Sequence, residues 1–194
     1  MAQISSLCIY CGSQKGRDPA HTALATAIGR RVAERGMTLV YGGGGIGLMT
    51  VAADAALAAG GRVVGVIPTH LAEAEIRHEG LSELLLTESM HERKAAMFDR
   101  ADAFAILPGG LGTLDEFFEI LTWRQIGLHD KPVVVVENAG YWAPLKAMID
   151  HVVAEGFASE RARALVTFVD GADGLFAALD AAPEPARGPS RDRL

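Results

Sequence analysis

The sequence predicts a three-layer α/β protein in which helices flank both faces of a doubly wound parallel sheet. Short apolar runs alternate with helical patterns from one end of the chain to the other, which is typical of repeated βαβ units. The runs are apolar throughout, as expected for strands that helices cover on both faces. Ligands of such folds bind at the carboxyl ends of the strands.

Seven short apolar runs are predicted as strands, and they cover residues 4–10, 37–41, 62–67, 83–88, 103–107, 132–137 and 164–169. Between most of these runs, apolar residues recur at three- and four-residue spacing. That spacing predicts helices over residues 19–36, 47–60, 89–101, 113–128 and 142–156. No internal repeat divides the chain, so we expect a single domain over residues 1–181.

Three of the helices carry clear start signals. Asp18 followed by Pro19 supplies an N-cap and a proline in the first turn. The stretches 89–92 and 113–116 each fit a capping box, in which a hydroxyl residue is followed three positions later by Glu. In the second of these boxes, the carboxylate of Glu116 is expected to close the cap of Thr113.

Two segments do not follow the alternating pattern. Residues 69–82 are polar, and we expect a loop or a short helix over the sheet edge that has the position of a lid. Residues 182–194 are rich in Pro and Arg and almost free of apolar residues, so a disordered tail is expected there.

Composition limits the classes of partner. The chain has 194 residues, of which 49% are hydrophobic and 22% charged, enough for one sizeable core. Its net charge of −6 argues against general binding to nucleic acid or to an anionic membrane. The first residues lack the basic and apolar pattern of a signal peptide, and no apolar run reaches the ~18 residues of a membrane span. We therefore expect a soluble, cytoplasmic protein.

The two cysteines form the motif Cys8-x-x-Cys11, which raises the question of redox chemistry or metal binding. On a strand, three residues of rise separate the two Cα atoms by roughly 10 Å, whereas a disulfide needs less than about 7 Å. No second cysteine pair or suitable histidine pair completes a zinc site. We predict a core role for Cys8, no metal and no cofactor.

A cluster of glycines follows the fifth predicted strand, in the stretch ILPGGLGTLDEF at residues 106–117. It lies on a turn from a strand to a helix, where backbone N–H groups at the helix start have no intrahelical acceptor. Glycine lets a ligand come close to such groups, so the turn suits an anion such as a phosphate. A tight turn with no ligand is the alternative.

A second cluster, YGGGGIGLMT at residues 41–50, also joins a strand to a helix. It contains G-x-G-x-x-G, but a dinucleotide site requires that motif after the first strand and an acidic residue about 20 positions later. The cluster follows the second strand, and the next strand ends in Ile67-Pro68-Thr69. Neither cluster continues into Gly-Lys-Ser/Thr, which excludes a P-loop.

Arg93 and Glu116 are the candidate reactive residues beside these turns. If they meet in one crevice, the arginine favours the ionised carboxylate. Such a carboxylate beside a bound sugar can hold ribose hydroxyls, stabilise an oxocarbenium-like centre or orient water. The alternatives are a capping role for Glu116 and a solvated helix charge for Arg93.

At this point the motifs resemble a known family. PGGLGTLDE at residues 108–116 has the pattern PGGxGTxxE, and with YGGGGIGLM and MHERK it is similar to the LOG (LONELY GUY) family of cytokinin-activating phosphoribohydrolases. Members of that family were often labelled lysine decarboxylases. The resemblance covers about residues 4–180.

The resemblance implies a Rossmann-like homodimer that hydrolyses the N-glycosidic bond of adenosine 5′-monophosphates, often N6-substituted, to the free base and ribose 5-phosphate. It places the catalytic arginine and glutamate at Arg93 and Glu116. The positions that bind substrate and phosphate fall on Gly12, Ser13, Gly43, Gly44, Gly47, Met90, Lys94, Gly109, Gly110, Gly112 and Thr113.

Two residues depart from the family pattern: Gln14 stands where Ser is common, and Thr50 where Gly is common. A second class of function also stays open, because related Rossmann-like proteins carry a phosphorylated nucleotide or the molybdenum cofactor without catalysis. The presence of both Arg93 and Glu116 favours the enzyme. A decarboxylase requires a Schiff-base lysine in a pocket motif, and the sequence has none in evidence.

Overall fold

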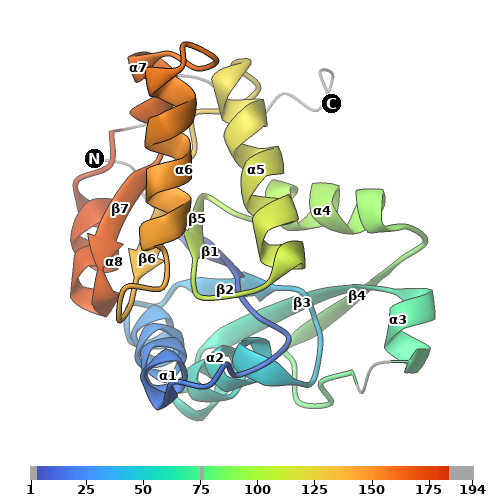
Figure 1. Cartoon of the computed structure of the whole chain (residues 1–194). Coiled ribbons are helices and arrows are strands. Elements are labelled where there is room, and N and C mark those ends of the chain that lie inside the picture. Colours follow the sequence, from blue (N-terminus) through green and yellow to red (C-terminus); the bar gives the residue numbers. More distant parts are fainter. Residues whose placement is uncertain (1–3, 75–76, 184–194) are drawn as a thin grey trace.

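A single parallel sheet forms the centre of the computed structural model, which describes residues 4–74 and 77–183 (Figure 1). Its strands are β1 (Ser6–Tyr10), β2 (Thr38–Tyr41), β3 (Arg62–Pro68), β4 (Glu83–Thr87), β5 (Ala103–Ile106), β6 (Val133–Glu137) and β7 (Thr167–Asp170). They lie in the order β4-β3-β2-β1-β5-β6-β7, and every neighbouring pair is parallel.

The helices are α1 (Pro19–Glu34), α2 (Gly47–Ala58), α3 (Thr69–Ala74), α4 (Met90–Asp99), α5 (Leu111–Gln125), α6 (Ala143–Ala154), α7 (Glu160–Arg163) and α8 (Gly171–Asp180). Buried residues of α1, α2 and α8 pack on one face of the sheet, and those of α4, α5 and α6 pack on the other. Alternate residues of β1 point to opposite faces of the sheet, so that Leu7 lies in the hydrophobic core on one face and Cys8 in the core on the other. The predicted three-layer, doubly wound fold is confirmed.

The chain changes direction across the sheet between β1 and β5. From β1 the strands β2, β3 and β4 follow on one side, whereas β5, β6 and β7 follow on the other. The turns after β1 and β5 touch at this switch point, where the Gly12 N–H donates to the Pro108 carbonyl at 3.0 Å. Ligands of doubly wound sheets bind in this crevice.

Two of the predicted helix starts are confirmed. The Asp18 carboxylate accepts from the Ala20 N–H at 2.8 Å, and the Ser89 hydroxyl accepts from the Glu92 N–H at 3.1 Å. The Glu92 carboxylate accepts in turn from the Glu88 N–H at 2.9 Å.

The predicted capping box of Thr113 and Glu116 is wrong. Helix α5 begins at Leu111, two residues before Thr113, because extended Gly110 is the N-cap. Thr113 and Glu116 therefore lie inside the helix, and no side chain caps it. The Glu116 carboxylate is directed to Arg93 of α4 instead.

Several predicted boundaries differ from the structure. The helices α7 and α8 were not predicted, although Asp170 and Gly171 mark the start of α8, whose buried side chains are Leu175, Phe176 and Leu179. The segment 69–82 begins with the short helix α3, and Arg77 forms an antiparallel bridge to Gly44. Of the predicted tail, residues 184–194 lie outside the described residues.

Both cysteines are free and buried, and Cys8 lies in the core as predicted. Among the described residues, no helix has both the length and the hydropathy to cross a membrane.

The carboxylate of Asp102, just before β5, fastens this strand to β1. It accepts hydrogen bonds from the backbone N–H groups and the hydroxyls of both Ser5 and Ser6 at 2.7 to 3.0 Å. Burial alone raises the pKa of Asp102, but these hydrogen bonds outweigh burial and hold its pKa below the usual value. The folded protein therefore favours the ionised form.

We expect Asp102→Ala to lower the free energy of unfolding by about 1–3 kcal/mol, because the donors of Ser5 and Ser6 lose their acceptor. Since the folded pKa lies below the unfolded one, the contribution of Asp102 is present above the unfolded pKa and is lost as pH falls through the folded pKa. Urea unfolding at neutral and acidic pH measures both effects. Exposed Asp130→Ala is the control; an equal loss in the two variants contradicts the prediction.

A candidate active site at the switch point

A cavity of about 230 Å³ lies at the carboxyl ends of β1, β2, β3 and β5. It is lined by the ends of these strands, the turns that follow them and residues of α2, α3, α4 and α5: Cys11, Ser13, Gly42, Met49, Ile67, Leu71, Arg93, Gly110, Leu111, Gly112, Thr113 and Glu116. The two glycine clusters of the sequence and the two candidate reactive residues therefore meet in one place.

Arg93 of α4 and Glu116 of α5 form a buried ion pair in this cavity. Arg93 Nη1 lies 2.8 Å from Glu116 Oε1, and only 10% and 11% of the two side chains are exposed. Arg93 Nε also donates to the Val66 carbonyl of β3 at 3.1 Å. The guanidinium is thus held from two sides and fixes the direction of the carboxylate.

Glycine is required at position 42 because the guanidinium lies against its backbone. A Cβ there would stand 2.1 Å from Arg93 Nη2. The second cluster therefore contributes to the site by leaving room for the arginine.

The buried position of Glu116 changes its proton affinity. Burial raises the pKa of Glu116 above the ordinary value, and the charge and hydrogen bond of Arg93 counteract that rise. A carboxylate held in this way keeps its second oxygen free to accept a hydrogen bond from a ligand or a water molecule.

The start of α5 presents backbone donors to the same cavity. The first hydrogen bond of the helix runs from the Leu114 N–H to the Gly110 carbonyl, and in the described structure the N–H groups of residues 111–113 have no protein acceptor. No side-chain cap competes for them. The free donors and the helix dipole favour an anion here.

The glycines of this turn are needed for different reasons. A Cβ at Gly109 would lie 2.1 Å from Thr113 Oγ1, so the fold itself requires glycine there. At Gly110 and Gly112 a Cβ would meet nothing within 4 Å, and neither residue has a positive φ. The fold makes no demand for glycine at these two positions, whereas a ligand close to the backbone does.

The structure brings only part of the predicted set into the cavity. Ser13, Arg93, Gly110, Gly112, Thr113 and Glu116 line it. Gly12 and Gly109 line a neighbouring cavity, and Gly47 borders the loop at residues 13–16. Gly43 has a φ of 74° and packs on β3, and Gly44 accepts a hydrogen bond from Thr50 at 3.3 Å.

Two further predicted residues, both on α4, lie outside the lining. The Lys94 ammonium is 3.2 Å from Asp115 and 3.0 Å from Glu119, so it joins α4 to α5 beside the buried pair. Met90 is partly exposed at the first position of α4. Neither residue is among those that surround the cavity.

Sequence reasoning missed the apolar wall of the cavity, which consists of Met49, Ile67, Leu71 and Leu111, and it did not place Cys11 there. Ile67 and Cys11 could have been found, because they lie at the carboxyl ends of parallel strands. Burial raises the pKa of the Cys11 thiol well above its usual value, so the thiol is neutral. In the described part of the chain, no group of three or more His, Cys, Asp or Glu side chains is placed to hold a metal.

Comparison with known proteins points to one family. The family model described as "Possible lysine decarboxylase" matches residues 49–179. The chain is 45% identical over 175 residues to the cytokinin riboside 5′-monophosphate phosphoribohydrolase of Rhodococcoides fascians, covering 90% of this chain and 88% of that protein. It is 46% identical over 160 residues to the enzyme named LOG of Oryza sativa subsp. japonica, covering 82% and 66%.

Solved structures with the same fold are more distant in sequence. The molybdenum cofactor binding protein of Rippkaea orientalis matches with a TM-score of 0.70 at 18% identity, over 91% of this chain and 95% of that one. A molybdenum cofactor carrier protein of Chlamydomonas reinhardtii matches with a TM-score of 0.67 at 19% identity, over 90% and 94%. At these identities the likeness shows the fold.

The ion pair makes a testable contribution to stability. We expect Arg93→Met and Glu116→Leu each to lower the free energy of unfolding by about 3–5 kcal/mol, because each leaves one buried charge without its partner. The double variant leaves no such charge, so its loss should be well below the sum of the two single losses. Urea unfolding of the four proteins measures the coupling; additive losses contradict a strong buried pair.

Proposed function

The chain belongs to the LOG family of cytokinin riboside 5′-monophosphate phosphoribohydrolases, and we propose that it hydrolyses the N-glycosidic bond of adenosine 5′-monophosphates. The substrates in this proposal are AMP and its N6-substituted forms, and the products are the free base and ribose 5-phosphate. One observation carries the proposal: the buried pair of Arg93 and Glu116 shares a cavity with the uncapped, glycine-rich start of α5.

The 5′-phosphate binds at the start of α5 in this proposal. Three backbone N–H groups without protein acceptors, the Thr113 hydroxyl and the positive end of the helix dipole favour it there. Open space above Gly110 and Gly112 lets phosphate oxygens approach the backbone. Because Glu116 lies one helical turn after Thr113, the ribose comes to lie beside its carboxylate.

The chemical step then replaces the bond from C1′ to the base by a bond to water. As the glycosidic bond breaks, the sugar gains oxocarbenium character, which the negative charge of Glu116 stabilises. Water adds its oxygen to C1′, and its proton balances the one that the departing base takes up. Arg93 keeps the carboxylate aimed at the sugar and offsets the effect of burial on its pKa.

Two other functions have less support. A non-catalytic carrier of a phosphorylated nucleotide or molybdenum cofactor rests on fold likeness below 20% identity. A lysine decarboxylase needs a lysine in the cavity, and none of the four lysines of the chain lines it. Lys131 is buried, but its ammonium donates to the Phe98 carbonyl at 2.7 Å.

The phosphate site predicts a difference between nucleotides and nucleosides. We expect the protein to cleave AMP and to cleave adenosine poorly or not at all, because binding energy at the phosphate positions the glycosidic bond. Thr113→Ala should weaken AMP turnover more than adenosine turnover. Chromatography of the released adenine measures both reactions, and equal efficiency on the two substrates contradicts a phosphate site at α5.

The same assay separates catalysis from binding. Glu116→Gln and Arg93→Ala should each remove most of the activity on AMP, whereas the exposed control Lys146→Met should keep it. Turnover near that of the unmodified protein in either site variant contradicts the proposed mechanism. If AMP binds but neither the unmodified protein nor any variant releases adenine, the carrier function is favoured.

We also propose that the protein forms a dimer through α6 and the ends of α5. An apolar groove of about 420 Å³ lies between the starts of these helices, and Leu111 and Met148 line it. Leu111 is 86% exposed, and Phe157 after α6 is 88% exposed. Within α5, Phe117 and Ile120 are buried in the core of the chain, so the large apolar residues exposed on this helix are Leu111 and, just after it, Ile126.

Light scattering at micromolar concentration should give twice the chain mass of 20.5 kDa. Met148→Glu with Val152→Glu should shift the protein to the monomer, because two charges are then buried at the interface. The control Ala27→Glu adds a charge to the exposed side of α1 and should leave the mass unchanged. A monomer in the unmodified protein contradicts the proposal.

A further inference from the structure

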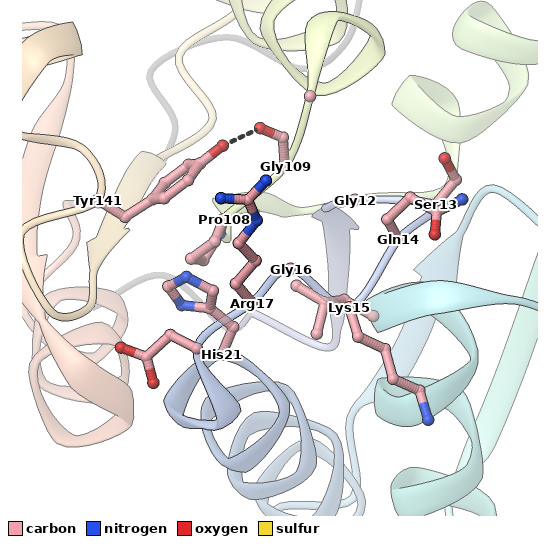
Figure 2. A pocket seen from close by; sticks show the side chains of 13 residues that line it. Gly12, Ser13, Gln14, Lys15, Gly16, Arg17, His21, Pro108, Gly109 and Tyr141 are labelled. Carbon is pink, nitrogen blue, oxygen red and sulfur yellow. Dashed lines mark hydrogen bonds between the residues drawn. The ribbon is translucent and has the colours of Figure 1, made fainter.

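A second and larger cavity, of about 500 Å³, lies beside the candidate active site. It is formed by the loop at residues 12–18, the first turn of α1, the turn at residues 108–110 and Tyr141 before α6 (Figure 2). Ser13 and Gly110 line both cavities. The proposed reaction uses none of the side chains that are found only in this second cavity.

Two cations of the loop line this cavity: the Arg17 guanidinium points into it, whereas the Lys15 ammonium is directed away from Arg17 (Figure 2). Lys15 and Arg17 line it, and in the described structure neither makes an ion pair or a side-chain hydrogen bond. The one acidic residue of the lining, Asp18, uses a carboxylate oxygen to cap α1 through the Ala20 N–H. The cavity is therefore locally positive in a chain whose net charge is −6.

A buried histidine adds a third donor. His21 is 7% exposed, and its Nδ1 accepts from Asn138 Nδ2 at 3.0 Å. In this arrangement Nε2 carries the proton, and it has no acceptor among the described residues. Figure 2 shows the imidazole beside the stem of Arg17, on the side away from Lys15.

The loop backbone holds further donors. The N–H groups of residues 13–17 make no hydrogen bond to protein within the described chain, and Gly16 has a φ of 74°. Consecutive free N–H groups in a loop with a left-handed residue form a concave surface that attracts anions. Arg17, His21 and the loop backbone thus offer donors that suit one kind of ligand group, an anion.

Tyr141 and Pro108 supply an aromatic and apolar part of the lining next to His21 (Figure 2). Tyr141 presents its ring edge to His21 at 5.3 Å between centroids, and its hydroxyl donates to the Gly109 carbonyl at 2.5 Å. Leu48 of α2 is a further apolar residue of the lining. The hydrogen bond to Gly109 holds the Tyr141 ring in place, and the volume lies within the range that small-molecule sites have.

We propose that this cavity binds a second nucleoside monophosphate, separate from the one beside Arg93 and Glu116. The phosphate lies against Arg17 and the loop N–H groups, the flexible Lys15 side chain turns toward it on binding, and the base lies against Tyr141 and Pro108. The proposal rests on the donors and the apolar part of the lining of this cavity. It does not require that the chain hydrolyses AMP.

Calorimetric titration of the Glu116→Gln protein with AMP tests the proposal, because this variant is designed to bind AMP without consuming it. We expect two molecules of AMP per chain. In the same background, Lys15→Met with Arg17→Met should weaken one of the two by roughly tenfold or more, since a phosphate loses its charged partners. Lys146→Met with Arg30→Met removes the same charge outside the cavity and should leave both sites unchanged.

Two competition experiments identify the part of the ligand that binds to Lys15 and Arg17. Inorganic phosphate should displace the AMP that depends on Lys15 and Arg17, whereas adenosine at equal concentration should not. Displacement by adenosine but not by phosphate overturns the placement of the phosphate.

Turnover separates this cavity from the active site. Lys15→Met with Arg17→Met, in the chain that retains Glu116, should hydrolyse saturating AMP at an unchanged rate if the proposed function is correct. A single AMP per chain that is unaffected by these substitutions overturns the second site. Loss of turnover in parallel with loss of binding also overturns it, because the cavity then belongs to the substrate site. If the unmodified chain hydrolyses nothing, the proposed function fails and the binding result still stands.

Discussion

The site depends on keeping one arginine and one carboxylate together out of water. Removing two charges from water is costly, and it is tolerated only when each finds good partners. Arg93 meets that condition through Glu116 and the Val66 carbonyl, and a glycine at position 42 leaves room for the guanidinium. Lys94, Asp115 and Glu119 form a second link between α4 and α5 next to the buried pair. The two helices are thus joined by electrostatic contacts inside and outside the cavity.

The glycines of the two clusters divide into those that the fold needs and those that it does not. At Gly42 and Gly109 a side chain would collide with atoms of the protein, so these residues allow the site to form. At Gly110 and Gly112 the protein leaves open space, and the free N–H groups of α5 face it. The sequence shows both kinds as the same letter. Only the neighbours in space separate a structural glycine from one that faces a ligand.

Much of the fold could be predicted because its signals are local. Unbroken apolar runs and helical spacing identify all seven strands and most of the helices. The start of α5 could not be predicted in this way, because Thr113 to Glu116 fits a capping box that long-range pairing of Glu116 with Arg93 overrides. The cavity wall at Leu71 and the turn of Lys94 toward Asp115 also depend on packing between distant segments. The pairing of Arg93 with Glu116 could be predicted from the sequence because both residues lie beside strand ends.

The order of the strands has a consequence for how the chain matures. The partner of β1 on one edge, β2, is made early in synthesis, whereas its other edge has no partner until β5 is made, whose Ala103 pairs with Leu7. Until about a hundred residues have been synthesised, the unpaired edge of β1 is open to contacts with other chains. Arg93 is synthesised before its partner Glu116, and until then only one wall of the crevice exists. The active-site cavity therefore cannot form until β5 joins β1 and α5 follows, and the second cavity also needs Tyr141; a chain released before β5 is made has neither.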